Sequence, residues 1–341
     1  MRQTFWSGMY RLVQPLRRPL RKALLSFLRS TESSAATMFD IYFAHRLLAD
    51  RQPTPNEWRQ WEAEAEAGRL SLEDLAIRAS NPHAPLVREL KLDGYVMYID
   101  PRDPLVGAPL AATREYEPQI TELFKQALAP DSVVLDVGAN MGWFTLLAAR
   151  LAPRGRIIAV EAYLGNVSLI EQSKAANGFA HIEIWPIAAS ERAELLTFAA
   201  PNSNGYVTAA DDPNPPTAQR VPAFALDDLL KTTERLDLVK IDIEGFEPYA
   251  VRGFAAALRR FRPVVFTEFH PWIMRAREPD LAQGYLNFWR DLGYRLTIIE
   301  TSGELREDQS DTQIWAYWSD LNARAGSAAG EHHLDLIARP G

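Results

Sequence analysis

The sequence has no cysteine among its 341 residues, which excludes disulfide bonds, thiolate catalysis and cysteine-ligated metal sites. It also lacks any apolar run near the roughly 20 residues that a transmembrane helix needs. No small-residue cleavage site follows a long apolar core, so nothing in the sequence calls for secretion. We therefore expect a cytoplasmic protein.

An excess of positive charge is missing too, since the formal net charge is −7. The first 30 residues nevertheless carry seven Arg and Lys and no acid, which leaves −14 for the remainder. That acidic remainder argues against a nucleic-acid partner held by a broad basic face. Residues 1–33 form either a basic amphipathic arm, whose residues 1–30 contact an anionic membrane or a partner, or a solvated N-terminus that Pro15 and Pro19 interrupt.

Residues 34–91 have the apolar spacing of about three short helices. So small a helical unit buries little apolar area by itself. We expect it to pack on the main domain, residues 92–341, or on a second copy of the chain in a homo-oligomer.

The main domain is organised around the apolar run Val133–Val137, which breaks into a turn containing Gly138 and Gly142 before a helix-like segment, residues 145–151. A strand, a glycine turn and a helix in this order are the opening unit of a nucleotide-binding α/β sheet.

The spacing of this turn indicates the ligand. The third glycine of a dinucleotide fingerprint is missing, which disfavours a dehydrogenase on the same sheet. Asp136 would repel a pyrophosphate but suits a cationic ligand. The next apolar run ends at Glu161, placed to bind ribose hydroxyls. Two acids and a glycine turn at neighbouring strand ends predict a site for S-adenosylmethionine.

A second informative stretch, residues 236–247, reads as a strand that ends in charged residues. Side chains alternate along a strand, so Lys240, Asp242 and Glu244 share one face. Three charges at the end of an apolar strand are costly unless they serve a ligand. The alternative is that the two acids only cap the following helix, predicted over residues 247–258.

The strand predicted over residues 263–270 also ends in ionisable groups, with Glu268 and His270 on one face. A neutral imidazole at His270 could accept a hydroxyl proton. Equally, Asp242 with Glu268 or His270 could hold a divalent cation that lowers the pKa of the hydroxyl. The sequence leaves both readings open.

Three further segments bear on the site. Residues 182–188 read as a strand containing a proline. Residues 201–220, rich in proline, read as a long irregular loop that either recognises the acceptor or is a surface excursion. Glu117, before a predicted helix over residues 119–128, either reaches the cofactor or only serves the helix dipole.

Together, these motifs resemble the FkbM-type family of S-adenosylmethionine-dependent O-methyltransferases. The resemblance spans residues 92–341 and is carried by Val134–Gly142 with Glu161, Ala225–Leu229, Lys240–Glu247 and Glu268–His270. The chain departs from the family at Ala162-Tyr163, where a proline usually follows the acid. The family pattern also does not include the N-terminal 90 residues.

The resemblance implies a class I methyltransferase fold, a Rossmann-like sheet of seven mostly parallel strands. It also implies methylation of a hydroxyl on a sugar, glycan or natural product. The residues assigned to the cofactor are Asp136, Gly138, Ala139, Asn140, Gly142, Phe144, Glu161, Ala162, Ala188 and Glu117. Those assigned to catalysis are His270, Asp242, Glu268, Lys240 and Glu244. The alternative from another class is an inactive cofactor-binding scaffold that docks a partner.

Overall fold

The computed structural model describes residues 61, 87–199, 203–208, 218–327 and 330–341. The chain groups by its contacts into two compact units, Met1–Leu86 and Val87–Gly341. The predicted arm, and the predicted helical unit up to residue 86 apart from Trp61, lie outside the described residues. No helix of the described part is long and apolar enough to cross a membrane.

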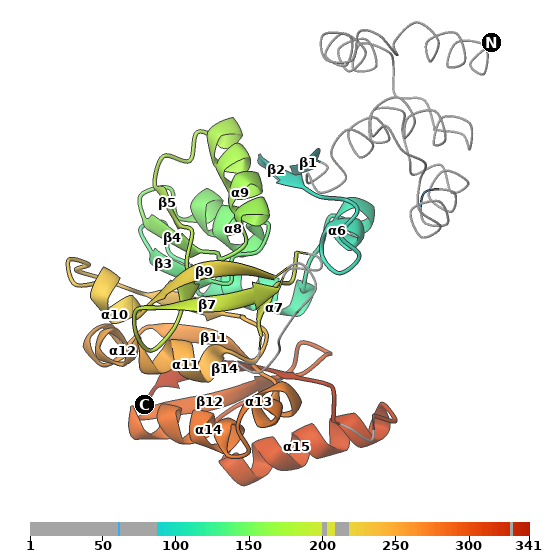
Figure 1. The fold of residues 1–341 in the computed structure, drawn as a ribbon, viewed down its shortest axis with the longest axis vertical. Helices are drawn as coiled ribbons and strands as arrows, with labels where there is room; N and C mark the ends of the chain where they lie inside the picture. Colours follow the sequence, from blue (N-terminus) through green and yellow to red (C-terminus); the bar gives the residue numbers. More distant parts are fainter. Residues whose placement is uncertain (1–60, 62–86, 200–202, 209–217, 328–329) are drawn as a thin grey trace, which may run out of the picture. The chain divides into compact units, whose positions relative to one another are not determined.

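The second unit is built on an eight-stranded sheet (Figure 1). In spatial order its strands are β13 (Leu305–Arg306), β12 (Tyr294–Ile299), β14 (Leu334–Pro340), β11 (Val264–Phe269), β10 (Leu238–Ile241), β3 (Val133–Val137), β4 (Arg156–Val160) and β5 (Ile182–Trp185). The pairs from β11 to β5 are parallel, whereas β14 is antiparallel to both β11 and β12. The seven predicted, mostly parallel strands are therefore confirmed, and the two-residue β13 extends one edge.

The sheet changes its winding direction at β3. Its chain successor β4 lies on one side of it and β10 on the other. In open α/β sheets, ligands bind at such a switch point, beyond the carboxyl ends of the strands. The glycine turn after β3 and the acids after β10 both lie at this position.

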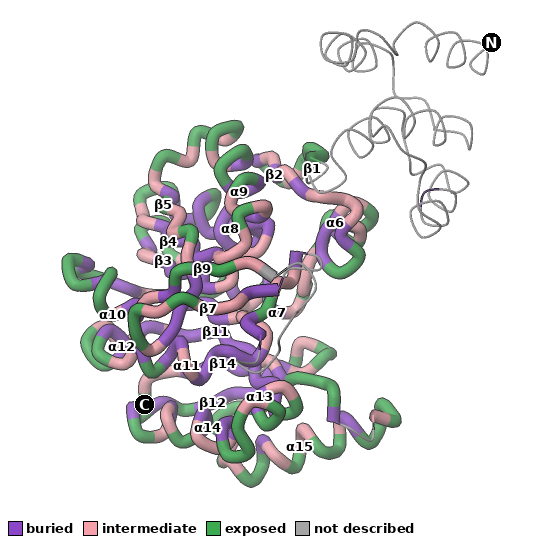
Figure 2. Tube along the Cα trace, viewed as in Figure 1, coloured by how far each residue is buried: buried purple, intermediate pink, exposed green. Residues whose placement is uncertain are grey.

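Helices cover both faces of the sheet (Figure 1). One face packs against α6 (Gly107–Thr113), α7 (Pro118–Gln126), α8 (Trp143–Leu151) and α9 (Leu164–Asn177). The other packs against α10 (Leu226–Leu229), α11 (Glu247–Arg252), α12 (Ala255–Phe261), α13 (Pro271–Arg277), α14 (Leu281–Asp291) and α15 (Asp311–Arg324). The central strands are buried along their length, as Figure 2 shows, which explains why they read as continuous apolar runs.

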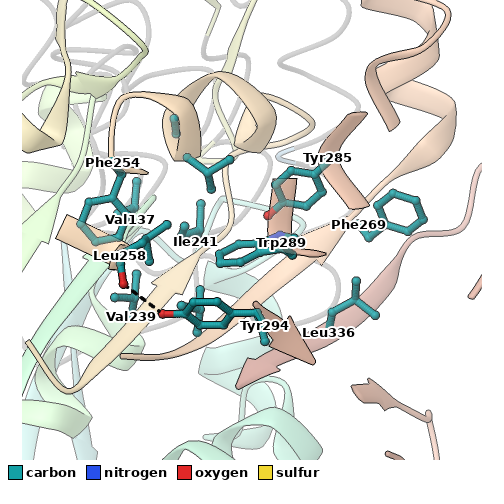
Figure 3. Close-up of a cluster of buried hydrophobic side chains, with 14 of the residues drawn as sticks. Val137, Val239, Ile241, Phe254, Leu258, Phe269, Tyr285, Trp289, Tyr294 and Leu336 are labelled. Atoms are coloured by element: carbon teal, nitrogen blue, oxygen red, sulfur yellow. Dashed lines mark hydrogen bonds between the residues drawn. The ribbon is translucent and has the colours of Figure 1, made fainter. Parts of the chain in front are cut away.

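Alternation along β3 decides which residues face which helices. Leu135 and Val137 belong to the core beneath α11 to α14, and Val134 belongs to the core beneath α7 to α9. The first of these cores is rich in aromatic residues, including Trp289 and Tyr294 (Figure 3). The Tyr294 hydroxyl donates a 3.4 Å hydrogen bond to the carbonyl oxygen of Leu258, which satisfies its polar end inside the core.

A second sheet lies between β5 and α10 in the chain. Its spatial order is β6 (Ala188–Ala189), β9 (Ala218–Phe224), β7 (Glu194–Ala199) and β8 (Tyr206–Val207). The strand predicted over residues 182–188 is therefore divided, because β5 ends before Pro186 and β6 pairs with the second sheet. The prediction of an irregular loop over residues 201–220 is wrong where β8 and the first residues of β9 lie.

One predicted helix also differs from expectation. The helix predicted over residues 247–258 is split into α11 and α12 at Gly253, where a Cβ atom would lie 2.0 Å from the carbonyl oxygen of Ser190. Before α6, β1 (Arg88–Leu92) and β2 (Tyr95–Ile99) pair as an antiparallel hairpin. The chain between β13 and β14 contains α15.

Candidate active site

A cavity opens at the switch point, with about 1160 Å³ of empty space that includes its mouth to solvent. Its walls come from the glycine turn after β3, the end of β4, the turn after β10, the end of β11 and the residues that precede or begin β14. The cavity therefore lies where open α/β sheets bind their ligands.

The glycine turn is held tightly to its neighbours. The amides of Gly138 and Ala139 donate to the carbonyl oxygen of Val160 at 2.9 and 3.1 Å. Gly138 has a φ of 84°, and a Cβ atom there would lie 1.9 Å from the carbonyl oxygen of Asp242. Glycine is needed at this position because the turns after β3 and β10 touch there through their backbones.

Glu161 supports the glycine turn from the end of β4. One carboxylate oxygen accepts a 2.7 Å hydrogen bond from the amide of Asn140, and the other accepts one of 2.7 Å from Tyr163. Burial raises the pKa of Glu161 to about 7, although these bonds oppose the shift. Glu161 is part of the cavity wall. Its predicted bond to a ribose stays a prediction.

Asp136 lies behind the turn instead of in the wall. It is buried on β3, and its carboxylate accepts a 2.6 Å hydrogen bond from the hydroxyl of Thr145 on α8. Burial raises the pKa of Asp136, and Lys240 and the Thr145 bond partly offset this. Gly142 does not line the cavity either. It is the N-cap residue of α8. The structure gives both residues a supporting position.

The turn after β10 brings the second charged motif to the opposite wall. The Lys240 ammonium forms a 2.6 Å ion pair with Asp242 and lies 4.6 Å from the centre of the Phe144 ring. Burial alone would raise the pKa of Asp242, but Lys240 lowers it below its usual value. Lys240, Asp242 and Glu244 all line the cavity.

Strand alternation does not account for the position of all three charged residues. β10 ends at Ile241, so strand alternation does not reach Glu244. Glu244 instead reaches the wall from a tight turn, in which its own φ is 56° and that of Gly245 is 81°. Glu247 holds this turn, because its carboxylate accepts hydrogen bonds from the amides of Ile243 at 2.9 Å and Gly245 at 3.3 Å.

The pKa of Glu244 is raised far above the usual value of a glutamate. Its burial, together with the nearby charges of Glu268 and Asp242, raises its pKa to about 8. An acid with this pKa is largely protonated at neutral pH in the free protein.

Glu268 pairs with a histidine for which the strand-end argument offered no role. His333 Nδ1 lies 2.9 Å from a carboxylate oxygen of Glu268, and both residues line the cavity with Asp335. Burial disfavours the charged imidazole, but the Glu268 bond and the nearby acids raise the pKa of His333 to about 10. Burial raises the pKa of Asp335 to about 6. Because β14 is antiparallel to β11, its start, not its end, reaches the ligand edge.

His270 is the predicted proton acceptor, and the structure does not bring it to the wall. It is the N-cap residue that precedes α13, it is buried, and its ring centre lies 5.9 Å from that of His333. Burial lowers the pKa of His270. Among the described residues, no group of three or more His, Asp or Glu side chains is arranged to hold a metal ion.

A short segment, residues 203–208, connects the two walls. The Asn140 side-chain amide donates a 2.6 Å bond to Asn204, and Asn204 donates a 3.0 Å bond to the Glu244 carboxylate. The backbone of Ser203 is held by the carboxylate of Asp103 at 2.6 Å and by the Asn166 amide at 3.0 Å. From the sequence, residues 201–220 were predicted to recognise the acceptor or to form a surface excursion. Asn204 was not singled out.

The structure thus brings most of the predicted site residues to one cavity. From the cofactor set these are Glu117, Gly138, Ala139, Asn140, Phe144, Glu161, Ala162 and Ala188, and from the catalytic set Lys240, Asp242, Glu244 and Glu268. Their roles stay predictions. A glycine turn and an acidic turn that meet at the switch point of this sheet define the class I methyltransferase type of domain.

Comparison with known proteins identifies the domain. Residues 136–296 match the family model described as the methyltransferase FkbM domain. This part of the chain is therefore similar to FkbM methyltransferases.

Among curated proteins, a 73-residue segment is 40% identical to the AMB antimetabolite synthetase AmbE of Pseudomonas aeruginosa. That segment is 21% of this chain and spans 3% of the length of AmbE. Among solved structures, the FkbM methyltransferase of Methylobacillus flagellatus is similar at 15% identity, with a TM-score of 0.39, over 79% of this chain and 58% of its own.

The O-methyltransferase TomG of Streptomyces achromogenes, involved in tomaymycin synthesis, is similar at 17% identity, with a TM-score of 0.38, over 67% of this chain and 82% of its own. An O-methyltransferase of Bacillus cereus is similar at 13% identity, with a TM-score of 0.38, over 68% of this chain and 86% of its own.

Proposed function

We propose that this protein is an S-adenosylmethionine-dependent O-methyltransferase that acts on a hydroxyl group of a sugar, glycan or natural product. The observation that carries the proposal is the backbone contact between Gly138 and Asp242, which joins the glycine turn and the acidic turn in one cavity. The family match supports the methyl-transfer chemistry.

The residues of the cavity fit this cofactor. Glu117 and Glu268 each have a buried carboxylate oxygen without a hydrogen-bond partner, and both residues line the cavity. Buried polar atoms are normally satisfied, so such atoms favour a polar or cationic ligand. Gly138, Ala139, Asn140 and Glu161 would hold the nucleoside. When bound, S-adenosylmethionine supplies a methyl group that its sulfonium has already activated.

What the chain must add is position and a proton acceptor. As the acceptor oxygen gains the methyl group, its proton has to pass to a basic atom of the wall. The unpartnered oxygen of Glu268 is placed for this, since His333 engages the other oxygen of the same carboxylate. The buried Nδ1 of His270, the proton acceptor proposed from the sequence, also lacks a partner, but His270 does not line the cavity.

The acceptor is expected to be neutral or cationic near its reacting hydroxyl. Asp242, Glu268 and Asp335 would repel a phosphate or carboxylate placed beside them. The same charges argue against a nucleic-acid backbone as substrate. Hydroxyl-rich molecules match such a wall, because carboxylates accept hydrogen bonds from hydroxyl groups.

Transfer of a tritiated methyl group tests the proposal. The protein would be incubated with labelled S-adenosylmethionine and a panel of neutral sugars, glycosides and phenolic natural products. We expect label in a base-stable ether product from at least one acceptor, and none with a Gly138→Ala variant. Cofactor binding without transfer to any acceptor would favour an inactive scaffold, and binding of NAD alone would favour a dehydrogenase.

A further inference from the structure

We propose that Glu117 receives the α-ammonium group of the cofactor's methionine half and so fixes that end of the cofactor in the cavity. This inference rests on the proposed function and names one contact within it. Glu117 lies just before α7, outside the two strand-end motifs, and it lines the same cavity as the glycine turn.

The backbone of Glu117 is held in a conformation that ordinary residues avoid. Its φ is 42° and its ψ is 62°, which is the left-handed region. The next residue is Pro118, and a residue before proline normally adopts an extended conformation. Strain of this kind tends to be retained at ligand sites. A simple helix cap does not require it, because cap residues are normally extended.

The side chain of Glu117 has unused capacity to bind a ligand. Its Oε2 atom is buried and makes no hydrogen bond within the described residues. Nor does its carboxylate cap α7, since no side-chain bond to that helix is made. A buried carboxylate oxygen without a partner destabilises the protein, and a donor from a bound ligand would remove that cost.

The charges around Glu117 point to a cationic donor. Lys240 and His333 act on it, but Lys240 is paired with Asp242 at 2.6 Å and His333 with Glu268 at 2.9 Å. The second oxygen of Glu268 has no partner either. With both cations already paired, the acids of the cavity outnumber them. An ammonium group offers three donors and the missing charge.

The test compares ligands with and without the ammonium group. S-adenosylhomocysteine carries it, whereas 5′-deoxy-5′-methylthioadenosine has the same nucleoside and no amino-acid part. Both would be titrated calorimetrically into the wild-type protein, into Glu117→Gln and into Glu115→Gln. Glu115 is an exposed acid two residues away that is not part of the cavity wall, so it is a matched control.

We expect Glu117→Gln to weaken S-adenosylhomocysteine by about tenfold or more, as for loss of a charge-assisted hydrogen bond. Methylthioadenosine should change by less than about twofold, and Glu115→Gln should bind both ligands as the wild type does. Equal weakening of both ligands by Glu117→Gln, or of neither, would overturn the inference. Failure of the wild type to bind S-adenosylhomocysteine would instead overturn the proposed function.

The pH dependence of binding gives an independent readout. Burial raises the pKa of Glu117 to about 7, with Asp242 and Asp335 adding to the shift and Lys240 and His333 opposing it. An ammonium ligand requires the ionised carboxylate, so affinity should rise by about tenfold between pH 6 and pH 8. Glu117→Gln should remove this rise. A rise of the same size in Glu117→Gln would assign it to another acid and contradict the inference.

Discussion

The two walls of the cavity differ in how far the protein satisfies them. In the glycine-turn wall, both oxygens of Glu161 accept backbone amides, and the hydroxyl of Thr145 bonds to Asp136 behind the turn. In the acidic wall, Glu268 keeps one oxygen unpartnered, and the pKa of Glu244 is raised to about 8 by burial and neighbouring acids. The acids of the first wall already have hydrogen-bond partners without a ligand, whereas the second wall keeps a carboxylate oxygen that has none.

This difference indicates how the work of binding is divided. A wall whose polar groups are already bonded presents a fixed shape, which suits a cofactor that is the same in every turnover. A wall with unsatisfied acids gains most when a ligand supplies donors or positive charge. Asn204 bonds to both walls, so a ligand that binds at one wall can change the position of groups in the other.

The largest expected effect comes from breaking the contact between the walls. In Gly138→Ala the new Cβ would lie 1.9 Å from the carbonyl oxygen of Asp242, and the backbone cannot yield without separating the turns. We expect loss of detectable S-adenosylhomocysteine binding in calorimetry and a loss of stability of about 2–4 kcal/mol in denaturant unfolding.

Gly178→Ala is the matched control for this change. Gly178 also has a positive φ, 67°, but nothing lies within 4 Å of its added Cβ. It should cost about 1 kcal/mol of stability and leave binding unaltered. Equal effects of the two substitutions would mean that the turn strain, and not contact between the walls, is what matters.

Asp136→Asn tests whether Asp136 stabilises the glycine-turn wall without contacting the cofactor. The variant weakens a buried charged hydrogen bond to Thr145, so we expect a loss of about 1–3 kcal/mol in the free energy of unfolding. S-adenosylhomocysteine affinity should fall by no more than about threefold. Lost binding at unchanged stability would instead return Asp136 to direct contact with the cofactor.

Glu244→Gln tests the acidic wall through the pH dependence of stability. Because the native pKa of Glu244 is about 8 and lies above its unfolded value, the native state binds the extra proton between about pH 5 and pH 8. Wild-type stability should therefore fall as pH rises through this window. The variant should melt about 2–6 °C higher than the wild type at pH 8 and equally at pH 5.

Glu331→Gln, at an exposed residue, is the control and should follow the wild type at both pH values. If Glu244→Gln and the wild type have parallel melting curves from pH 5 to pH 8, Glu244 is ionised throughout and the acidic wall is less strained than its burial implies.

The smallest effect is expected where the two walls are joined. Asn204→Ala removes its bonds to Asn140 and Glu244, and we expect S-adenosylhomocysteine affinity to fall by about three- to fivefold. The exposed Asn287→Ala should have no effect on binding. An unchanged affinity in Asn204→Ala would show that the walls act independently.

The part of the site on parallel strands could be predicted from sequence. β3, β10 and β11 are buried on both faces, so they appear as apolar runs whose ends can be located, and the acids that follow converge at the switch point. This reasoning placed Glu161, Asp242 and Glu268 at one edge of the sheet, and the structure has them there.

The rest could not be predicted, for identifiable reasons. His333 precedes an antiparallel strand, so a search for acids and histidines at strand ends passes it over. Asn204 lies in a short segment whose order depends on distant partners such as Asp103. The break at Gly253 depends on a contact with Ser190, which no local pattern reveals. Non-local contacts decide each of these.

The central claim is that the two walls form one cofactor site, and calorimetric titration of the wild-type protein with S-adenosylhomocysteine tests it most directly. NAD would be titrated in parallel under the same conditions. We expect S-adenosylhomocysteine to bind with one site per chain and NAD to give no heat of binding. Binding of NAD, with no binding of S-adenosylhomocysteine, would contradict the account.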